Sequence, residues 1–184
     1  MLTFEPVVRL ATCEDAVKYL DFLFKLDIES DWMHFGSGER SMDERGMRSR
    51  LRKMERQGNA FAVLAFNLAG EVIGYFSVNG GNSSSTRHSG TCAVGVLDVY
   101  RHNGLARQLF LTALAQCGKV HVKRLECTVV VYNNKAVDFY KRCGFIEVGR
   151  LHDRFQSRMT GEYLDEYILE YDRVRPNYQI DFSR

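Results

Sequence analysis

Two short blocks of the sequence combine residue types that bind anions and move protons. The first is Arg101-His102-Asn103-Gly104-Leu105-Ala106, which follows an apolar stretch and precedes a helical one. At such a turn the first N–H groups of the helix have no intrahelical partner and lie at the positive end of its dipole. The turn is therefore a candidate phosphate site. Arg101 and Arg107 add positive charge, and Gly104 permits close approach of a ligand. A plain chain reversal is the alternative.

The second block runs from Asn133 to Phe145 and reads NNKAVDFYKRCGF. Asn133 and Tyr140 lie seven residues apart, which is about two helical turns, so they project toward one side of a helix. A tyrosine with a pKa near ~10 is a workable acid for a departing thiolate whose own pKa is near ~8.5. Asn133 is also a natural N-cap, and a tyrosine in a short helix often belongs to the core. Both alternatives stay open.

The two blocks together resemble the signatures of the GNAT acetyltransferases. Arg101-x-x-Gly104-x-Ala106 matches the family's R/Q-x-x-G-x-G/A, and the second block matches its N-x-x-A-x-x-x-Y-x-x-x-G-F. The stretches IESDWM, GFIEVGRLHD and GEYLDEYILEY are similar to the bacterial branch that acetylates ribosomal-protein N-termini and small amines. The resemblance implies a single domain over residues 1–184 with the acyl-CoA N-acyltransferase fold. That fold is α/β, with a mixed, mostly antiparallel central sheet of about seven strands and flanking helices.

The resemblance also implies acetyl-CoA as cosubstrate, no metal, and an amine acceptor that attacks directly in a ternary complex. Tyr140 is then the acid, and Asn133 contacts the CoA arm. A backbone N–H near Val96 or Leu97 serves the oxyanion. The pantetheine arm is expected along the backbone of Val96, Leu97, Asp98 and Val99. The pyrophosphate is expected on the turn and its first helical residues, namely Arg101, His102, Asn103, Gly104, Leu105, Ala106 and Arg107.

A base is the missing part, because the attacking amine must be neutral. Better-known family members carry a glutamate on the strand before the turn, whereas residues 91–97 here contain no carboxylate. Glu126 and Glu29 are the first candidates for this role, Asp31 and His88 are further ones, and a water relay without a dedicated base is the alternative. The residues expected to contact the acceptor are Glu29, Asp31, Trp32 and His88. For each of these polar residues, an ordinary solvated or ion-paired surface position is the competing interpretation.

Hydrophobic periodicity predicts the elements that position these residues. A helix is expected from about Asp15, a second from a Ser41–Glu44 capping box, a third from Leu105 and a fourth from Asn134. The predicted strands are Phe4–Leu10, Ala60–Asn67, Val72–Val78, Thr91–Asp98, Val122–Val131, Phe145–Leu151 and Tyr163–Tyr171.

Composition excludes several classes of function. A net charge of +2 gives no case for a nucleic-acid partner, so the arginine-rich helix after Ser41 is expected to be a solvated face. The sequence contains no apolar run of 18 residues, so no membrane span is predicted. Five cysteines without a C-x-x-C motif indicate neither a zinc site nor a redox pair, and a cytoplasmic location is expected. The prediction is an N-acetyltransferase of a small amine or peptide N-terminus, and the resemblance favours a homodimer. A dedicated protein N-terminal acetyltransferase and a non-catalytic acyl-CoA sensor are the alternatives.

Overall fold

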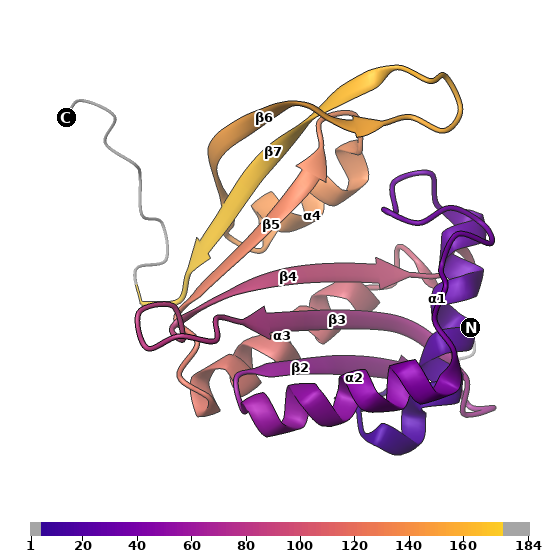
Figure 1. Cartoon of the computed structure of the whole chain (residues 1–184), viewed down its shortest axis with the longest axis vertical. Helices are drawn as coiled ribbons and strands as arrows, with labels where there is room; N and C mark the ends of the chain where they lie inside the picture. The colour runs from indigo at the N-terminus through magenta and orange to yellow at the C-terminus, as the bar shows by residue number, and fades with distance from the viewer. Residues whose placement is uncertain (1–4, 175–184) are drawn as a thin grey trace.

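The computed structural model describes residues 5–174 and has a seven-stranded sheet at its centre (Figure 1). The strand order is β1-β2-β3-β4-β5-β7-β6, and every neighbouring pair is antiparallel except β4 and β5, which are parallel. This confirms the predicted α/β fold with a mostly antiparallel sheet. The strands are β1 (Val7–Leu10), β2 (Ala60–Phe66), β3 (Val72–Gly80), β4 (Ser89–Val96), β5 (Arg124–Val130), β6 (Ile146–Gln156) and β7 (Tyr163–Asp172).

Four α-helices cover the two faces of the sheet, in two apolar layers. The helices are α1 (Ala16–Glu29), α2 (Glu44–Gln57), α3 (Leu105–Lys119) and α4 (Asn134–Arg142). Alternate strand residues face opposite sides. Phe76 therefore packs in the layer under α3 and α4 with Leu109 and Tyr140, whereas Leu64 packs under α1 and α2. Two 3₁₀ turns, Cys13–Asp15 and Asp98–Tyr100, precede α1 and follow β4.

Several boundaries differ from the sequence prediction for local reasons. The first strand begins at Val7, and its predicted start at Phe4 lies outside the described residues. Helix α2 is capped by Asp43 rather than by Ser41, because the Asp43 carboxylate accepts a hydrogen bond from the Gly46 N–H at 2.8 Å. Strand β6 runs on to Gln156, since an irregularity between Leu151 and Phe155 lets it resume pairing with β7.

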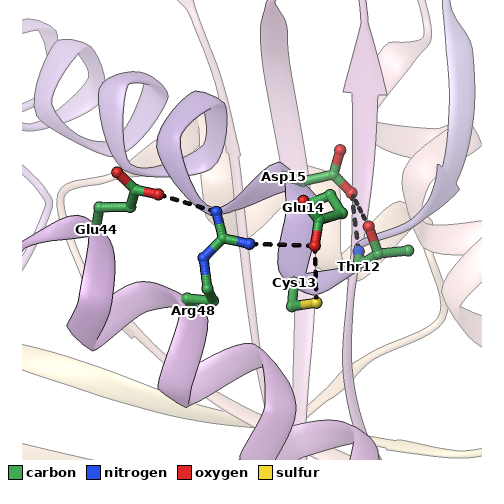
Figure 2. Close-up of polar contacts among 6 residues, drawn as sticks. All are labelled: Thr12, Cys13, Glu14, Asp15, Glu44 and Arg48. Atoms are coloured by element: carbon green, nitrogen blue, oxygen red, sulfur yellow. Dashed lines mark hydrogen bonds and ion pairs between the residues drawn. The ribbon is translucent and has the colours of Figure 1, made fainter.

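The arginine-rich helix α2 is joined to the 3₁₀ turn that precedes α1 by one of its basic residues. Figure 2 shows the Arg48 guanidinium between two carboxylates, those of Glu44 at 2.9 Å and Glu14 at 3.2 Å. Arg48 therefore has a structural role that sequence analysis did not assign. Within residues 5–174, no helix is long and apolar enough to cross a membrane.

Candidate active site

The two parallel strands in the middle of the sheet separate along their length. Strands β4 and β5 pair from Ser89↔Arg124 to Thr91↔Glu126 and no further, although β4 continues to Val96 and β5 to Val130. Figure 1 shows the two strands diverging beyond this point. We call the point of separation, just beyond Thr91 and Glu126, the fork. Beyond the fork, no strand among residues 5–174 pairs with the β4 edge that faces β5.

The backbone of β4 presents free groups along this edge. Leu97 donates its N–H to Ile73 O on β3 at 3.1 Å. Since N–H and C=O groups alternate in direction along an antiparallel strand, those of Val94 and Val96 point toward the open side. An extended ligand can therefore pair with β4 like an added strand.

The expected pairing along residues 96–99 stays a prediction, and only its first member lies on the strand, because β4 ends at Val96 and the chain turns at Asp98–Tyr100. The N–H of Leu97 is occupied by Ile73, and the N–H of Asp98 donates to the Glu29 carboxylate at 2.9 Å. Of the two residues considered as oxyanion donors, only Val96 retains an N–H that faces the fork.

The turn between β4 and α3 is rich in unused N–H groups. Within the described part of the chain, no acceptor bonds the backbone N–H of His102, Asn103, Gly104, Ala106 or Arg107, and Leu105 N–H meets only the Asn103 side chain at 3.4 Å. His102 and Gly104 have positive φ values of 65° and 82°, which turns successive N–H groups toward one concavity. We call residues 101–107 the cradle turn. Its N–H groups without described partners are suited to bind the oxygens of a diphosphate.

The charged side chains of the cradle turn divide between two tasks. The Arg101 guanidinium turns back toward the strand, where Nε donates to Val96 O at 2.8 Å and Nη1 pairs with the Asp98 carboxylate. Arg101 therefore fixes the end of β4. Arg107 is exposed at the first turn of α3 and has no described partner. It is the cation available to an anion at this helix N-terminus.

Tyr140 reaches the fork from α4 and is 4% exposed. Cys92 and Cys127 immediately follow the last paired residues of β4 and β5, and both contribute to the environment of the Tyr140 hydroxyl. Burial, followed by these two thiols, raises the pKa of Tyr140 well above its usual value. The hydroxyl therefore stays protonated at neutral pH, as a proton donor requires.

Asn133 has a structural role that sequence analysis allowed for. Its side-chain oxygen accepts from the Ala136 N–H at 3.3 Å, so it caps α4. Its contact with the CoA arm stays a prediction.

The carboxylates and the histidine proposed for the acceptor side lie in different places. Glu29 links the end of α1 to the end of β4 through Asp98. Glu126 sits at the closed end of the fork, where it lines a polar cavity of about 240 Å³ with Arg124 and Glu170. His88 precedes β4 and lies roughly 25 Å of strand length from Val96. The structure does not bring these three side chains together.

Two segments meet over the open end of the fork. In the loop between α1 and α2, the carbonyls of Met33 and Ser30 accept hydrogen bonds from Arg158, at 2.8 and 3.2 Å. Arg158 belongs to the turn between β6 and β7. The rings of Trp32 and Phe155 lie 6.5 Å apart. Trp32 and the adjacent exposed Asp31 are therefore placed where an acceptor could meet them.

Sequence analysis missed one carboxylate of this region. Glu166 on β7 is 3% exposed and stands opposite Val130, the last residue of β5. The sequence pattern that could have revealed Glu166 is the alternation of Leu164, Glu166 and Ile168, which puts a glutamate among apolar residues on one strand face. No group of three or more histidine, cysteine or acidic residues that could hold a metal occurs within residues 5–174.

The fold and the fork define an acetyltransferase architecture, and the chain belongs to the Acetyltransferase (GNAT) family, whose model matches residues 26–145. A curated relative is L-amino acid N-acetyltransferase AaaT of Escherichia coli K12. It is 28% identical over 101 residues, which is 54% of this chain and 61% of the relative. The match therefore spans less than two thirds of that protein.

Solved structures share the fold over most of their length. A GNAT-family acetyltransferase from Streptococcus pneumoniae has 25% identity and a TM-score of 0.86, with 91% of this chain and 99% of that one covered. A ribosomal-protein-alanine N-acetyltransferase from Brucella melitensis has 22% identity and a TM-score of 0.77, with 90% and 99% covered. A phosphinothricin acetyltransferase from Sinorhizobium meliloti, solved with acetyl-CoA, has 16% identity and a TM-score of 0.78, with 91% and 88% covered.

Proposed function

We propose that the protein is an N-acetyltransferase that moves an acetyl group from acetyl-CoA to a primary amine. The observation that carries the proposal is the combination of an open β4 edge with the cradle turn at its end. Five backbone N–H groups of the cradle turn have no described partners, and Tyr140, whose pKa is raised by burial, lies at the fork. The GNAT family match supports acetyl transfer from CoA to an acceptor.

The residues divide the work along the length of the substrate. The N–H groups from His102 to Arg107, with the Arg107 side chain, bind the pyrophosphate. The backbone of Val94 pairs with the pantetheine, which directs the thioester toward the fork. The N–H of Val96 lies on the open edge, where it donates to the carbonyl oxygen as negative charge develops there. Tyr140 protonates the departing thiolate.

The acceptor is a primary amine on a small molecule or at a peptide N-terminus. The curated relative acts on L-amino acids by its name, which supports a small-amine substrate. We assign the acceptor side to the loop between α1 and α2, with Asp31 and Trp32, together with the turn between β6 and β7. Glu29 links that loop to the end of β4 through the Asp98 N–H, and we do not assign it the role of the base that deprotonates the amine.

The replacement of Tyr140 by Phe tests the catalytic assignment. Loss of the hydroxyl should lower kcat about 100-fold or more, which is typical of a lost general acid, with the Kd for acetyl-CoA changed less than twofold. Steady-state thiol release and calorimetric binding measure the two quantities. A non-catalytic sensor would bind acetyl-CoA equally well before and after the change and would show no transfer in either protein. A Tyr140→Phe variant with unchanged kcat would contradict the role of the hydroxyl.

A further inference from the structure

Glu166 is a carboxylate that the rest of the site does not explain. It is 3% exposed, and among residues 5–174 no hydrogen bond or ion pair is formed to its side chain. A nearly buried, unpaired carboxylate weakens a fold, because the charge has lost its hydration without gaining a partner. Its presence at this position therefore calls for a reason other than stability.

The carboxylate oxygens of Glu166 are not completely sealed from solvent. In the described part of the chain, no completely buried side-chain oxygen lacks a hydrogen-bond partner. The two unpaired oxygens of Glu166 must therefore keep some solvent contact, although the residue as a whole is almost covered. A small polar group can approach them, whereas bulk water has little access.

The position of Glu166 relates it directly to the fork. On β5, Leu125, Cys127 and Val129 face α3 and α4, so the alternate residues Thr128 and Val130 face the other side of the sheet. Glu166 is paired in register with Val130 and shares that face. Since neighbouring strands lie about 4.8 Å apart, its side chain starts one strand away from the open end of the fork.

The segments around Glu166 are those assigned to the acceptor. On its other side it is paired with Leu151 of β6. Two residues before Glu166 on β7, Leu164 is paired with Phe155 of β6. The ring of Phe155 lies 6.5 Å from that of Trp32, and Arg158 holds the α1–α2 loop to the same hairpin. Glu166 is thus a carboxyl group with apolar neighbours on both adjacent strands, on the acceptor side of the sheet.

We propose that Glu166 binds the ammonium group of the acceptor and takes one of its protons, an inference that rests on the proposed acetyl transfer. The protonated amine gives one proton to the carboxylate. The nitrogen lone pair then forms the C–N bond to the thioester carbon, and the C–S bond breaks. The thiolate takes the Tyr140 proton, and the second proton lost from nitrogen restores that hydroxyl. The proton on Glu166 passes to solvent, so each turnover releases one proton.

The ligand class that follows is a primary amine that is cationic at neutral pH. The carboxylate replaces the hydration of the ammonium group in a site with little water, where a charge pair is stronger than at the surface. Glu126 does not occupy an equivalent position, because it lies at the closed end of the fork and in the outer polar cavity.

The test compares the wild-type protein with Glu166→Gln, which keeps the shape of the side chain, and with Glu147→Gln, an exposed control on β6. Thiol release is measured with acetyl-CoA and a panel of L-amino acids, polyamines and short peptides. We expect Glu166→Gln to lower kcat/KM for the amine at least 100-fold, with the Kd for acetyl-CoA within twofold of wild type. The thermal midpoint should be unchanged or higher, because an unpaired buried charge is removed. The Glu147→Gln control should match the wild type in kcat/KM for the amine, in the Kd for acetyl-CoA and in the thermal midpoint.

Two results would overturn the inference while leaving acetyl transfer intact. One is a Glu166→Gln protein whose kcat/KM stays within threefold of wild type. The other is a loss of activity accompanied by a lower thermal midpoint or by weaker acetyl-CoA binding, which would mark a structural role. If the wild-type protein releases no CoA with any amine, the proposed function itself fails, and the role of Glu166 fails with it.

Discussion

At the scale of single residues, the site depends on backbone groups as much as on side chains. Gly104 shows this most clearly. Its φ of 82° is a left-handed conformation, and an added Cβ would meet nothing within 4 Å. The glycine is needed for the shape of the turn and for open space above the N–H groups, not for packing.

Replacement of Gly104 by Ala should lower the free energy of unfolding by roughly 1 kcal/mol, the cost of an L-residue in this conformation. It should also raise the Kd for acetyl-CoA, because the methyl group enters the concavity. Gly58 has a φ of 79° and equally open surroundings at the end of α2, so Gly58→Ala is the matched control. Denaturant unfolding and calorimetry measure both variants. Equal Kd values for the two would contradict the assignment of the cradle turn.

The sequence alone was enough to predict roles for the residues whose position depends on local structure. The cradle turn and the helix of Tyr140 follow from a glycine, a strand-to-helix change and a seven-residue spacing. Glu166 and the bonding of Glu29 to Asp98 could not be predicted in the same way, because each depends on which strands and helices become neighbours. The alternation of Leu164, Glu166 and Ile168 did show that one glutamate faces an apolar side, yet the face it shares with β5 required the sheet order.

At the scale of elements, the fork depends on the change from pairing to separation between β4 and β5. The fold class and most element boundaries were predictable, because helical and strand periodicities are strong here. The end of β4 was not, because the Asp98–Tyr100 turn is stabilised by contacts with distant residues. Glu29 binds the Asp98 N–H across 69 residues of sequence. The long β6 was also missed, since its bulge interrupts the strand pattern.

The bulge of β6 is held by one carboxylate of β7. Asp165 accepts from the Asp153 N–H at 3.0 Å and from Arg150 Nε at 2.7 Å, and it contacts His152 Nδ1 at 3.1 Å. Asp153 has a positive φ of 52° in this bulge. Asp165 thereby sets the path of β6 beyond Leu151, and with it the position of the turn that carries Arg158.

Arg158 should govern the acceptor but not the cosubstrate. Its guanidinium holds the carbonyls of Met33 and Ser30, so Arg158→Ala should loosen the α1–α2 loop. We expect the KM for the amine to rise about tenfold, with the KM for acetyl-CoA unchanged and stability lowered by less than about 1 kcal/mol, as for other exposed contacts. Arg154→Ala is the control, because Arg154 is exposed on β6 without a described partner. A rise in the acetyl-CoA KM with no change for the amine would show that the loop serves a different ligand.

At the scale of the whole molecule, the stability of the fold should depend on pH through carboxylates with a lowered pKa, namely Asp15 and Asp165 together with the exposed Glu14 and Glu71. Burial alone would raise the pKa of Asp15, but hydrogen bonds from Arg9 and Thr12 outweigh it and lower the pKa. The Asp153 N–H and Arg150 lower that of Asp165. A depressed pKa in the folded state stabilises the protein at pH values above the unfolded pKa of about 3.9. That stabilisation is lost as the pH falls through the folded-state value.

The thermal midpoint should therefore fall as the pH is lowered from about 5 to 3. Asp165→Asn removes one of these contributions, so the fall should be smaller in this variant. Scanning calorimetry at a series of pH values measures both proteins. An equal fall of the thermal midpoint in the wild type and in Asp165→Asn would show that Asp165 makes no net contribution to the pH dependence of stability.

The central claim is that the open β4 edge, the cradle turn and Tyr140 transfer an acetyl group to an amine. The most direct measurement is thiol release by the purified wild-type protein with acetyl-CoA and the amine panel, with mass spectrometry of the product. We expect one CoA to be released for each amine that gains an acetyl group, and no comparable release without the amine. Failure to bind acetyl-CoA, or binding without any acetylated amine, would contradict it.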